Sequence, residues 1–178
     1  MSTNTIQRIP TGTYQLDPVH SSIAFGVRFN GLAMFRSTFD VVQAELVDGV
    51  LSGAADVGSI RIDEPHFKGH LLAEDFFNAD VAPTLSFRST DIRPSEGGQA
   101  VVDGELTIRG VSRPVTASGT YAVGTDLRGG ERAAFSLATT LDRRDFGLEW
   151  QMPLPDGSDA LDWNVTVSVE LQLVKQDS

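Results

Sequence analysis

The segment Leu16–Phe29 contains residue types that could form a hydrolytic site: Asp17, His20, Ser21 and Ser22. In a nucleophilic triad a carboxylate orients a histidine, and the histidine takes the proton of a serine. Triad members usually come from separate segments, whereas these are neighbours, and in a strand Ser21 would point away from the face of His20. We therefore expect Asp17 to start a turn, and His20 and Ser21 to bond backbone groups at the end of a sheet.

Two other histidines, His66 and His70, are four residues apart in a segment of helical character. On one face of a helix they could bind a metal ion with an oxygen ligand from Asp63, Glu64 or Glu74. The HExxH pattern is absent and no separate segment supplies further ligands. We expect no metal here, and we expect His70 to bond a neighbouring loop or a ligand head group.

Pairs of carboxylates, Glu74–Asp75 and Asp142 with Asp145, could suggest acid–base catalysis. In so acidic a chain most carboxylates are solvated. The DRRD segment, residues 142–145, is better explained by a turn and inter-strand ion pairs that position Phe146–Leu148 and Trp150. The sequence contains no GxGxxG, P-loop or GxSxG motif. We expect a protein that is not an enzyme.

The charge of the chain limits its partners. Fourteen Lys and Arg stand against 24 Asp and Glu, a formal net charge of -10. Nucleic acid and anionic lipid surfaces would repel such a protein, so we expect neither as a partner. Cysteine is absent from the 178 residues, which excludes disulfides, thiolate nucleophiles and cysteine-bound metals.

The first 14 residues contain no apolar region of the length that a secretory signal needs, and no later stretch approaches a transmembrane span. We expect a cytoplasmic protein without stable membrane insertion, in which residues 1–11 are flexible. A homodimer is compatible with an all-β domain, but no motif indicates one.

Apolar and polar residues alternate along most of the chain, which is the pattern of strands with one buried face. The pattern is clearest in residues 161–173, where the odd-numbered positions are apolar: Leu161, Trp163, Val165, Val167, Val169, Leu171 and Leu173. The same alternation predicts inward-facing sets in five other stretches, residues 23–29, 85–87, 102–108, 115–123 and 133–141.

Two further stretches, Phe39–Val47 and Val50–Ile62, are also extended, and Asp48–Gly49 between them is a turn signal. Only residues 65–76 have helical character, with apolar residues four apart, an early proline and Asp63 as the N-cap. The sequence therefore predicts one short amphipathic helix, Pro65–Phe76, among about eight strands.

These elements predict a single all-β domain over residues 1–178. An eight-stranded antiparallel barrel is favoured over a sandwich because closure removes exposed strand edges. Such a barrel is just wide enough to be filled by side chains or to hold one slim ligand. Small residues on the predicted inner face favour a cavity, although they could equally mark bends or close strand packing: Gly104, Ala117, Gly119 and Ala133.

Four stretches together resemble the YceI-like family, the lipocalin-like polyisoprenoid-binding proteins. They are YQLDPVHSSIAFGVRF (14–29), GHLLAEDFFNADVAPTLSFRST (69–90), VDGELTIRGVSRPVTASGTY (102–121) and DRRDFGLEW (142–150). They follow the family's order over most of the chain. The resemblance implies an eight-stranded lipocalin-like barrel with an elongated apolar cavity, a helix between two strands, and a bound isoprenoid chain rather than a reaction.

The chain departs from the family pattern at two places. Members often carry an Arg-Asp pair and one further residue just ahead of a His-Leu, where this chain has HFKGHL, residues 66–71. The first strand commonly carries a histidine after its alternating run, where this chain has Phe29–Asn30. Both differences concern the polarity of the pocket mouth and its preferred head group.

We expect the protein to bind, and to sequester or carry, a long-chain polyisoprenoid or isoprenoid quinone, with no other cofactor. The expected ligand-binding residues are Phe25, Val27, Phe29, Leu106, Ile108, Phe135, Leu137, Trp163 and His70. Bulky substitutions at Gly104 or Gly119 should then block the ligand. Two alternatives stay open: a barrel enzyme that uses His20 or His70 as acid or base on a hydrophobic substrate, and a packed interaction module of the bacterial stress response.

Overall fold

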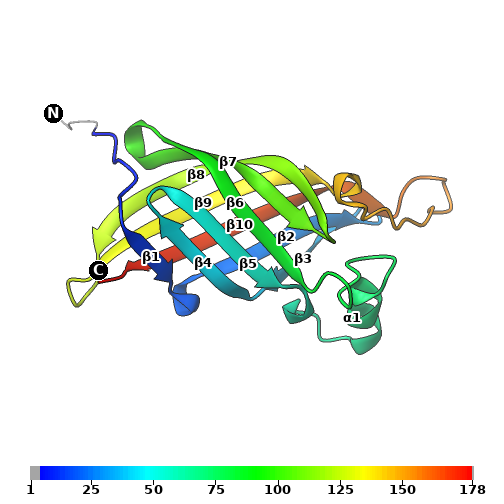
Figure 1. Cartoon of the computed structure of the whole chain (residues 1–178). Coiled ribbons are helices and arrows are strands. Elements are labelled where there is room, and N and C mark those ends of the chain that lie inside the picture. The colour runs from blue at the N-terminus through cyan, green and yellow to red at the C-terminus, as the bar shows by residue number, and fades with distance from the viewer. Residues whose placement is uncertain (1–4, 178) are drawn as a thin grey trace.

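The computed structural model describes residues 5–177 as one antiparallel sheet that closes into a barrel, with one α-helix at one end (Figure 1). The helix, α1 (Pro65–Leu72), lies between the fifth and sixth strands. The strands in this part of the chain are β1 (Thr13–Leu16), β2 (Ser22–Phe29), β3 (Ala33–Phe39), β4 (Val41–Val47), β5 (Val50–Asp56), β6 (Thr84–Pro94), β7 (Gln99–Ile108), β8 (Val111–Thr125), β9 (Glu131–Asp142) and β10 (Leu161–Lys175).

The ten strand segments of residues 5–177 form a barrel of eight strands. Two strands of the barrel are each interrupted and therefore consist of two segments. β1 and β2 both pair with β10, with the short turn Pro18–His20 between them. On the next strand of the barrel, β4 pairs with β1 and β3 pairs with β2. Only Asp40 separates β3 from β4. The ring continues through β5, β6, β7, β8 and β9 back to β10. The predicted eight-stranded antiparallel barrel is confirmed.

Polar side chains form the break between β1 and β2. Asp17 accepts a hydrogen bond from the backbone N–H of Val19, and Ser21 Oγ bonds both the N–H and the C=O of Gln172 on β10. These contacts match the expected turn and the expected role of Ser21. The expectation for His20 was wrong, because its Nδ1 lies 2.8 Å from the carboxylate of Asp17 and not against a backbone group.

The first part of β3 is a strand that the alternation did not predict. Its inward positions are Phe35, Ser37 and Phe39, and the polar residue in the middle breaks the apolar pattern. Ser37 is nevertheless buried, because its hydroxyl donates to the carbonyl oxygen of Arg61 at 2.8 Å. A hydrogen bond to a distant part of the chain therefore lets the hydroxyl of Ser37 be buried. From its residue type alone, Ser37 would be expected on an exposed face.

Helix α1 is shorter than expected. Glu64, and not Asp63, is its N-cap, since its carboxylate accepts hydrogen bonds from the N–H groups of two residues of the first turn. The helix ends at Leu72, because Ala73 is already extended and Phe76 lies in the turns that follow. The helix and these turns lie at the barrel end where β3 pairs with β2 but has no second strand partner among residues 5–177 (Figure 1).

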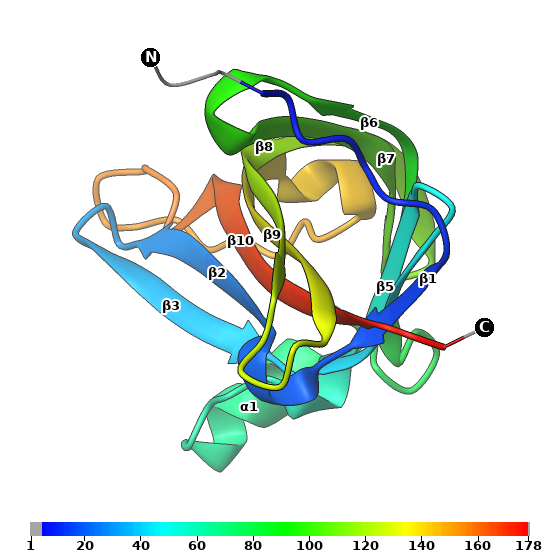
Figure 2. The same ribbon diagram turned by 90° about the vertical axis from the view of Figure 1, so that its left-hand side faces the viewer.

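The barrel interior has two halves. The end that faces the viewer in Figure 2 is filled by side chains that are at most 2% exposed, here called the closed-end cluster: Tyr14, Leu46, Val102, Tyr121, Phe135 and Leu173. Around α1 a second group, here called the mouth cluster, packs between the helix and the strands: Val27, Phe39, Ile60, Leu71, Phe76, Leu148 and Leu161. The closed end therefore behaves as an ordinary packed core.

The N-terminal segment before β1 runs along the barrel. The side-chain amide of Gln7 forms two hydrogen bonds of 2.9 Å with the backbone of Val123 on β8, and Tyr121 Oη donates to the carbonyl oxygen of Arg8. Residues 1–4 lie outside the described residues, so the flexibility expected for residues 1–11 stays a prediction there, while Gln7 is held against β8.

Candidate functional site

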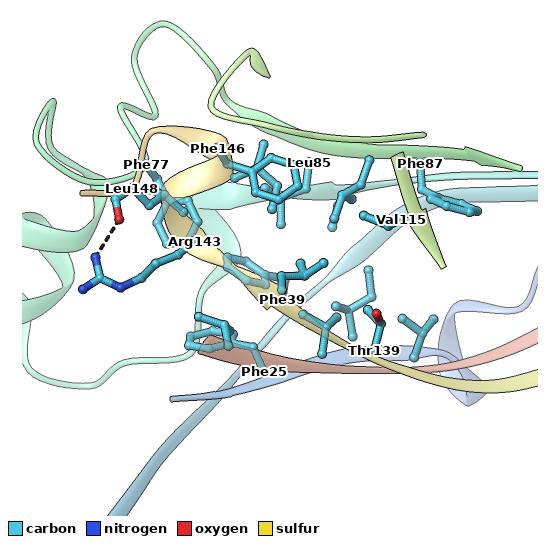
Figure 3. A pocket seen from close by; sticks show the side chains of 18 of the residues that line it. Phe25, Phe39, Phe77, Leu85, Phe87, Val115, Thr139, Arg143, Phe146 and Leu148 are labelled. Carbon is cyan, nitrogen blue, oxygen red and sulfur yellow. Dashed lines mark hydrogen bonds between the residues drawn. The ribbon is translucent and has the colours of Figure 1, made fainter. Parts of the chain in front are cut away.

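A cavity of about 700 Å³ occupies the half of the barrel next to α1 (Figure 3). Its wall combines the inner faces of β2 to β10 with α1 and the segment after β9. The lining is almost entirely hydrocarbon; the polar residues in it are Ser52, Ser86, Thr139, His70 and Arg143. No Asp or Glu of residues 5–177 lines it. Pockets of roughly 300–1,000 Å³ accept small molecules, and this lining suits a hydrocarbon.

Strand alternation decides which side chains face the cavity. On β10 the inward positions Val165, Val167 and Val169 line it. Thr166 and Ser168 between them are exposed on the outer face. The inward set predicted from the sequence on β10 is therefore found at these positions, because successive side chains of a strand point to opposite faces.

Phenylalanine is the main aromatic lining of the cavity. Of the ten phenylalanines in the chain, nine line it, the exception being Phe135. Phe39 links the wall to the turns after α1, with ring centroids 5.4 Å from Phe25 and 5.7 Å from Phe77. The list of expected ligand-binding residues left out most of this set: Phe35, Phe39, Phe67, Phe76, Phe77, Phe87 and Phe146. An available signal was composition, ten Phe against two Tyr and two Trp.

The mouth of the cavity is marked by lining residues that are also exposed, Phe29 at the end of β2 and Phe67 on α1. The imidazole of His70 on α1 meets Phe76 and Trp150 edge to face, with ring centroids 5.3 and 5.2 Å away. Phe29 and Phe67 line the cavity and are also 44% and 39% exposed. Apolar surface is therefore continuous from the inside of the barrel to the solvent at this end.

Arg143 fixes the segment that closes one side of the mouth. It is 3% exposed, and its guanidinium donates to four backbone carbonyls, those of Leu148, Trp150, Leu161 and Asp162, at 2.6 to 3.1 Å. Figure 3 shows the bond to Leu148. Burial lowers the pKa of this guanidinium. The DRRD turn was expected to position residues 146–150, and it does so through these carbonyls. The expectation of inter-strand ion pairs was wrong: Arg144 bonds Asp142 of the same turn, at 2.6 Å.

Seven of the nine predicted ligand-binding residues line the cavity: Phe25, Val27, Phe29, Leu106, Ile108, Leu137 and His70. Phe135 was wrongly placed there. It belongs to the closed-end cluster, where its ring lies 5.0 Å from that of Tyr121. Trp163 was also wrongly placed, because β10 is irregular between Leu161 and Val165 and the indole lies over the guanidinium of Arg143, outside the cavity.

The glycines expected to widen the cavity have another role. A Cβ at Gly104 would lie 2.4 Å from the ring of Phe87 and 2.5 Å from the carbonyl oxygen of Arg88. One at Gly119 would lie 1.9 Å from the carbonyl oxygen of Ser136. Close packing therefore explains both glycines. Of the other two small residues, Ala117 lines the cavity and Ala133 is part of the packed closed end.

Comparison with known proteins assigns the chain to a family. A model of the YceI-like domain matches residues 14–173. The chain belongs to the YceI-like family. A UPF0312 protein of Vibrio cholerae is 30% identical over 138 residues, 73% of each chain. One from Pseudomonas putida is 34% identical over 108 residues, 60% of this chain and 53% of the other.

Solved structures share the fold of this YceI-like chain. A polyisoprenoid binding domain from Saccharophagus degradans, implicated in plant cell wall breakdown, aligns with a TM-score of 0.69 at 15% identity, over 92% of this chain and 98% of the other. Burkholderia cenocepacia BcnA aligns with a TM-score of 0.67 at 17% identity, over 88% and 98% of the two chains. At such identities the likeness establishes the lipocalin-like barrel and nothing finer.

Neither histidine proposed as an acid or base has a catalytic setting in this YceI-like protein. His20 is not among the cavity-lining residues, its side chain is 57% exposed, and it bonds Asp17, which also binds Arg132 at 2.5 Å. The hydrogen bond from Arg132, and then that from His20, hold the pKa of Asp17 well below its usual range. His70 does line the cavity, but it lies between two aromatic rings with no carboxylate of the described chain beside it in the lining.

His66 and His70, weighed above as possible metal ligands, have no third ligand arranged with them in the described residues. Within residues 5–177, no three His, Asp or Glu side chains are arranged to bind one metal ion.

None of the helices in this part of the chain is long and apolar enough to cross a bilayer.

Proposed function

We propose that this YceI-like protein binds a polyisoprenoid or an isoprenoid quinone by its hydrocarbon chain and sequesters or carries it. The observation that carries this proposal is the cavity of about 700 Å³, with an apolar lining and an apolar mouth. The family and the structural relative described as a polyisoprenoid binding domain support the same ligand class.

Burial of the chain supplies enough free energy for binding. Each methylene removed from water contributes roughly 0.8 kcal/mol, so a five-carbon isoprene unit contributes about 3 to 4 kcal/mol before losses. Several kcal/mol are lost when the chain is immobilised, but a few units offset this. Affinity should therefore rise with the number of units and depend less on the head group.

The head group belongs at the mouth. The one cationic side chain that lines the cavity within residues 5–177 is Arg143, and its guanidinium is already bonded to backbone carbonyls. A charged head group inside would thus be desolvated without a partner, which is costly. The apolar rings of Phe29 and Phe67 mark the mouth where the chain would enter and the head group would stay in contact with water.

The test is organic extraction of freshly purified protein followed by mass spectrometry, together with titration of delipidated protein with geranylgeraniol. An extracted prenyl lipid and saturable binding are expected. A prenyl lipid recovered in cleaved or altered form would instead favour catalysis. Absence of both lipid and uptake would refute carriage and favour the packed interaction module.

A matched pair of variants ties binding to the cavity. Ala117 lines it, whereas Ala122 is exposed on the outer face of the same strand. Ala117→Phe should fill the cavity and abolish uptake, and Ala122→Phe should bind as the unaltered protein does. Equal uptake by the two variants would place the ligand elsewhere. The cytoplasmic location, the stress-response role, the homodimer and the lack of any other cofactor stay predictions of the sequence.

A further inference from the structure

The cavity ends at a floor inside the barrel. Several lining residues pack against the closed-end cluster, and they mark where the open half meets the filled half: Ala44, Leu51, Phe87, Ala117, Leu137 and Leu171. Beyond them the side chains of the closed-end cluster are fully buried. A ligand that enters at the mouth therefore meets a blind end.

Phe87 is the one aromatic residue of this floor. In Figure 3 it lies at the end of the cavity opposite Arg143 and Leu148, beyond Leu85 on the same strand. Its position follows from the pairing of β6 with β7, in which Phe87 faces Leu106 and the next inward position faces Gly104.

Gly104 holds the Phe87 ring in place. Two ring carbons of Phe87 occupy the space where a Cβ of residue 104 would be, 2.4 and 2.5 Å from its ideal position. The ring therefore lies over the backbone of β7 and is directed toward the closed end. The ring also packs against the buried side chains of the closed end, so it has no deeper position to move into when a ligand chain pushes against it.

The volume of the cavity sets how much chain it can hold. If each carbon of a liquid-like hydrocarbon takes roughly the 30 Å³ that a water molecule takes in liquid water, 700 Å³ holds roughly 23 carbons. That corresponds to between four and five isoprene units of five carbons. Longer chains would have to leave their remaining units outside the mouth.

We propose that Phe87, seated on Gly104, forms the stop that limits the bound hydrocarbon chain to four or five isoprene units. This inference rests on the proposed function and adds a length selectivity to it. Replacing Phe87 by alanine removes six ring carbons at the blind end. The space gained is close to that of one isoprene unit, and it extends the cavity along the direction in which the chain lies.

The test is a titration of delipidated protein with neutral prenyl alcohols of two to seven units. For the unaltered protein, affinity should rise at least tenfold per unit up to four or five units, and less than threefold per unit beyond. Phe87→Ala should move this break one unit longer. Phe87→Trp should move it shorter, since the recess over Gly104 is already occupied.

Phe29→Ala is the matched control. It removes the same six carbons from a ring that is 44% exposed at the mouth and adds no depth at the blind end, so overall affinity should fall while the break stays where it is. Phe87→Leu, which should shift the break in the same direction by less, replaces Phe87→Ala if the latter does not fold. An unchanged break in the Phe87 variants, or an equal shift in Phe29→Ala, would overturn the length stop while leaving carriage intact. Failure of the unaltered protein to bind any chain would overturn both.

Discussion

The guanidinium of Arg143 lies 4.1 Å from the ring centroid of Trp163. The indole covers the cation from outside, and its own Nε1 donates to Asp159 at 2.8 Å. A desolvated cation over an indole face is stabilised by about 2 kcal/mol. Arg143 and Trp163, from different segments, thus pack against each other next to the apolar cavity. The Arg143 guanidinium at the same time holds the segment after β9 through its backbone carbonyls.

Arg143→Met should destabilise the fold strongly. It leaves buried carbonyls without a donor, so the free energy of unfolding should fall by about 3 to 5 kcal/mol. Arg61→Met is the control, because Arg61 and its ion-pair partner Asp40 are both more than half exposed, and it should cost about 1 kcal/mol or less. Urea denaturation measures both. Similar small losses in the two variants would contradict the role given to Arg143.

The two tryptophans should report differently on the ligand. Trp150 lines the cavity mouth, whereas Trp163 lies outside it against Arg143. Binding of a prenyl chain should shift the fluorescence of Trp150, so Trp163→Phe should keep the ligand-induced change and Trp150→Phe should lose it. A change carried by Trp163 alone would mean that the ligand binds outside the described cavity.

Gly119→Ala should be among the most harmful small substitutions. The added methyl group would meet the backbone oxygen of Ser136 at 1.9 Å, and β8 and β9 cannot separate without breaking their pairing. We expect a loss of about 3 kcal/mol or more. Gly124→Ala on the same strand meets nothing within 4 Å and should be neutral. Thermal unfolding of the pair distinguishes a close-packing glycine from one that merely leaves space.

Through Asp17, the free energy of unfolding should depend on pH. Its pKa in the folded protein lies below the ordinary 3.8, first because Arg132 and then because His20 donates to it. A lowered folded-state pKa stabilises the fold above the unfolded value, and that stability is lost as the pH falls from about 4 toward the folded-state pKa. Asp17→Asn should therefore cost about 1 to 3 kcal/mol at pH 7.

The difference between Asp17→Asn and the unaltered protein should shrink as the pH falls below 4. Urea denaturation between pH 2 and 7 measures it. Asp80→Asn, at an exposed position, is the control and should follow the unaltered protein. A difference that stays constant down to pH 2 would mean that ionisation of Asp17 does not contribute.

The sequence was sufficient to predict the barrel because strand alternation is a local property. The inward residues of β2, such as Ile23, Phe25 and Val27, follow directly from it, and so does the turn at Asp48–Gly49, where both residues have positive φ. Residues 33–38 were missed since Ser37 is buried through a bond to Arg61, which no local pattern reveals.

The sequence by itself determined the fold class, the inward face of most strands and six cavity-lining residues on them, because one side chain in two must point inward whatever the strand's neighbours are. Only the tertiary structure decided where the interior is open and where it is filled. Phe135 and Leu137 share a face on β9, yet one packs against Tyr121 in the closed end and the other lines the cavity. Their difference depends on how far each lies along the barrel, and that is set by strand pairing between distant parts of the chain. In the same way, an irregularity in β10 carried Trp163 out of the lumen.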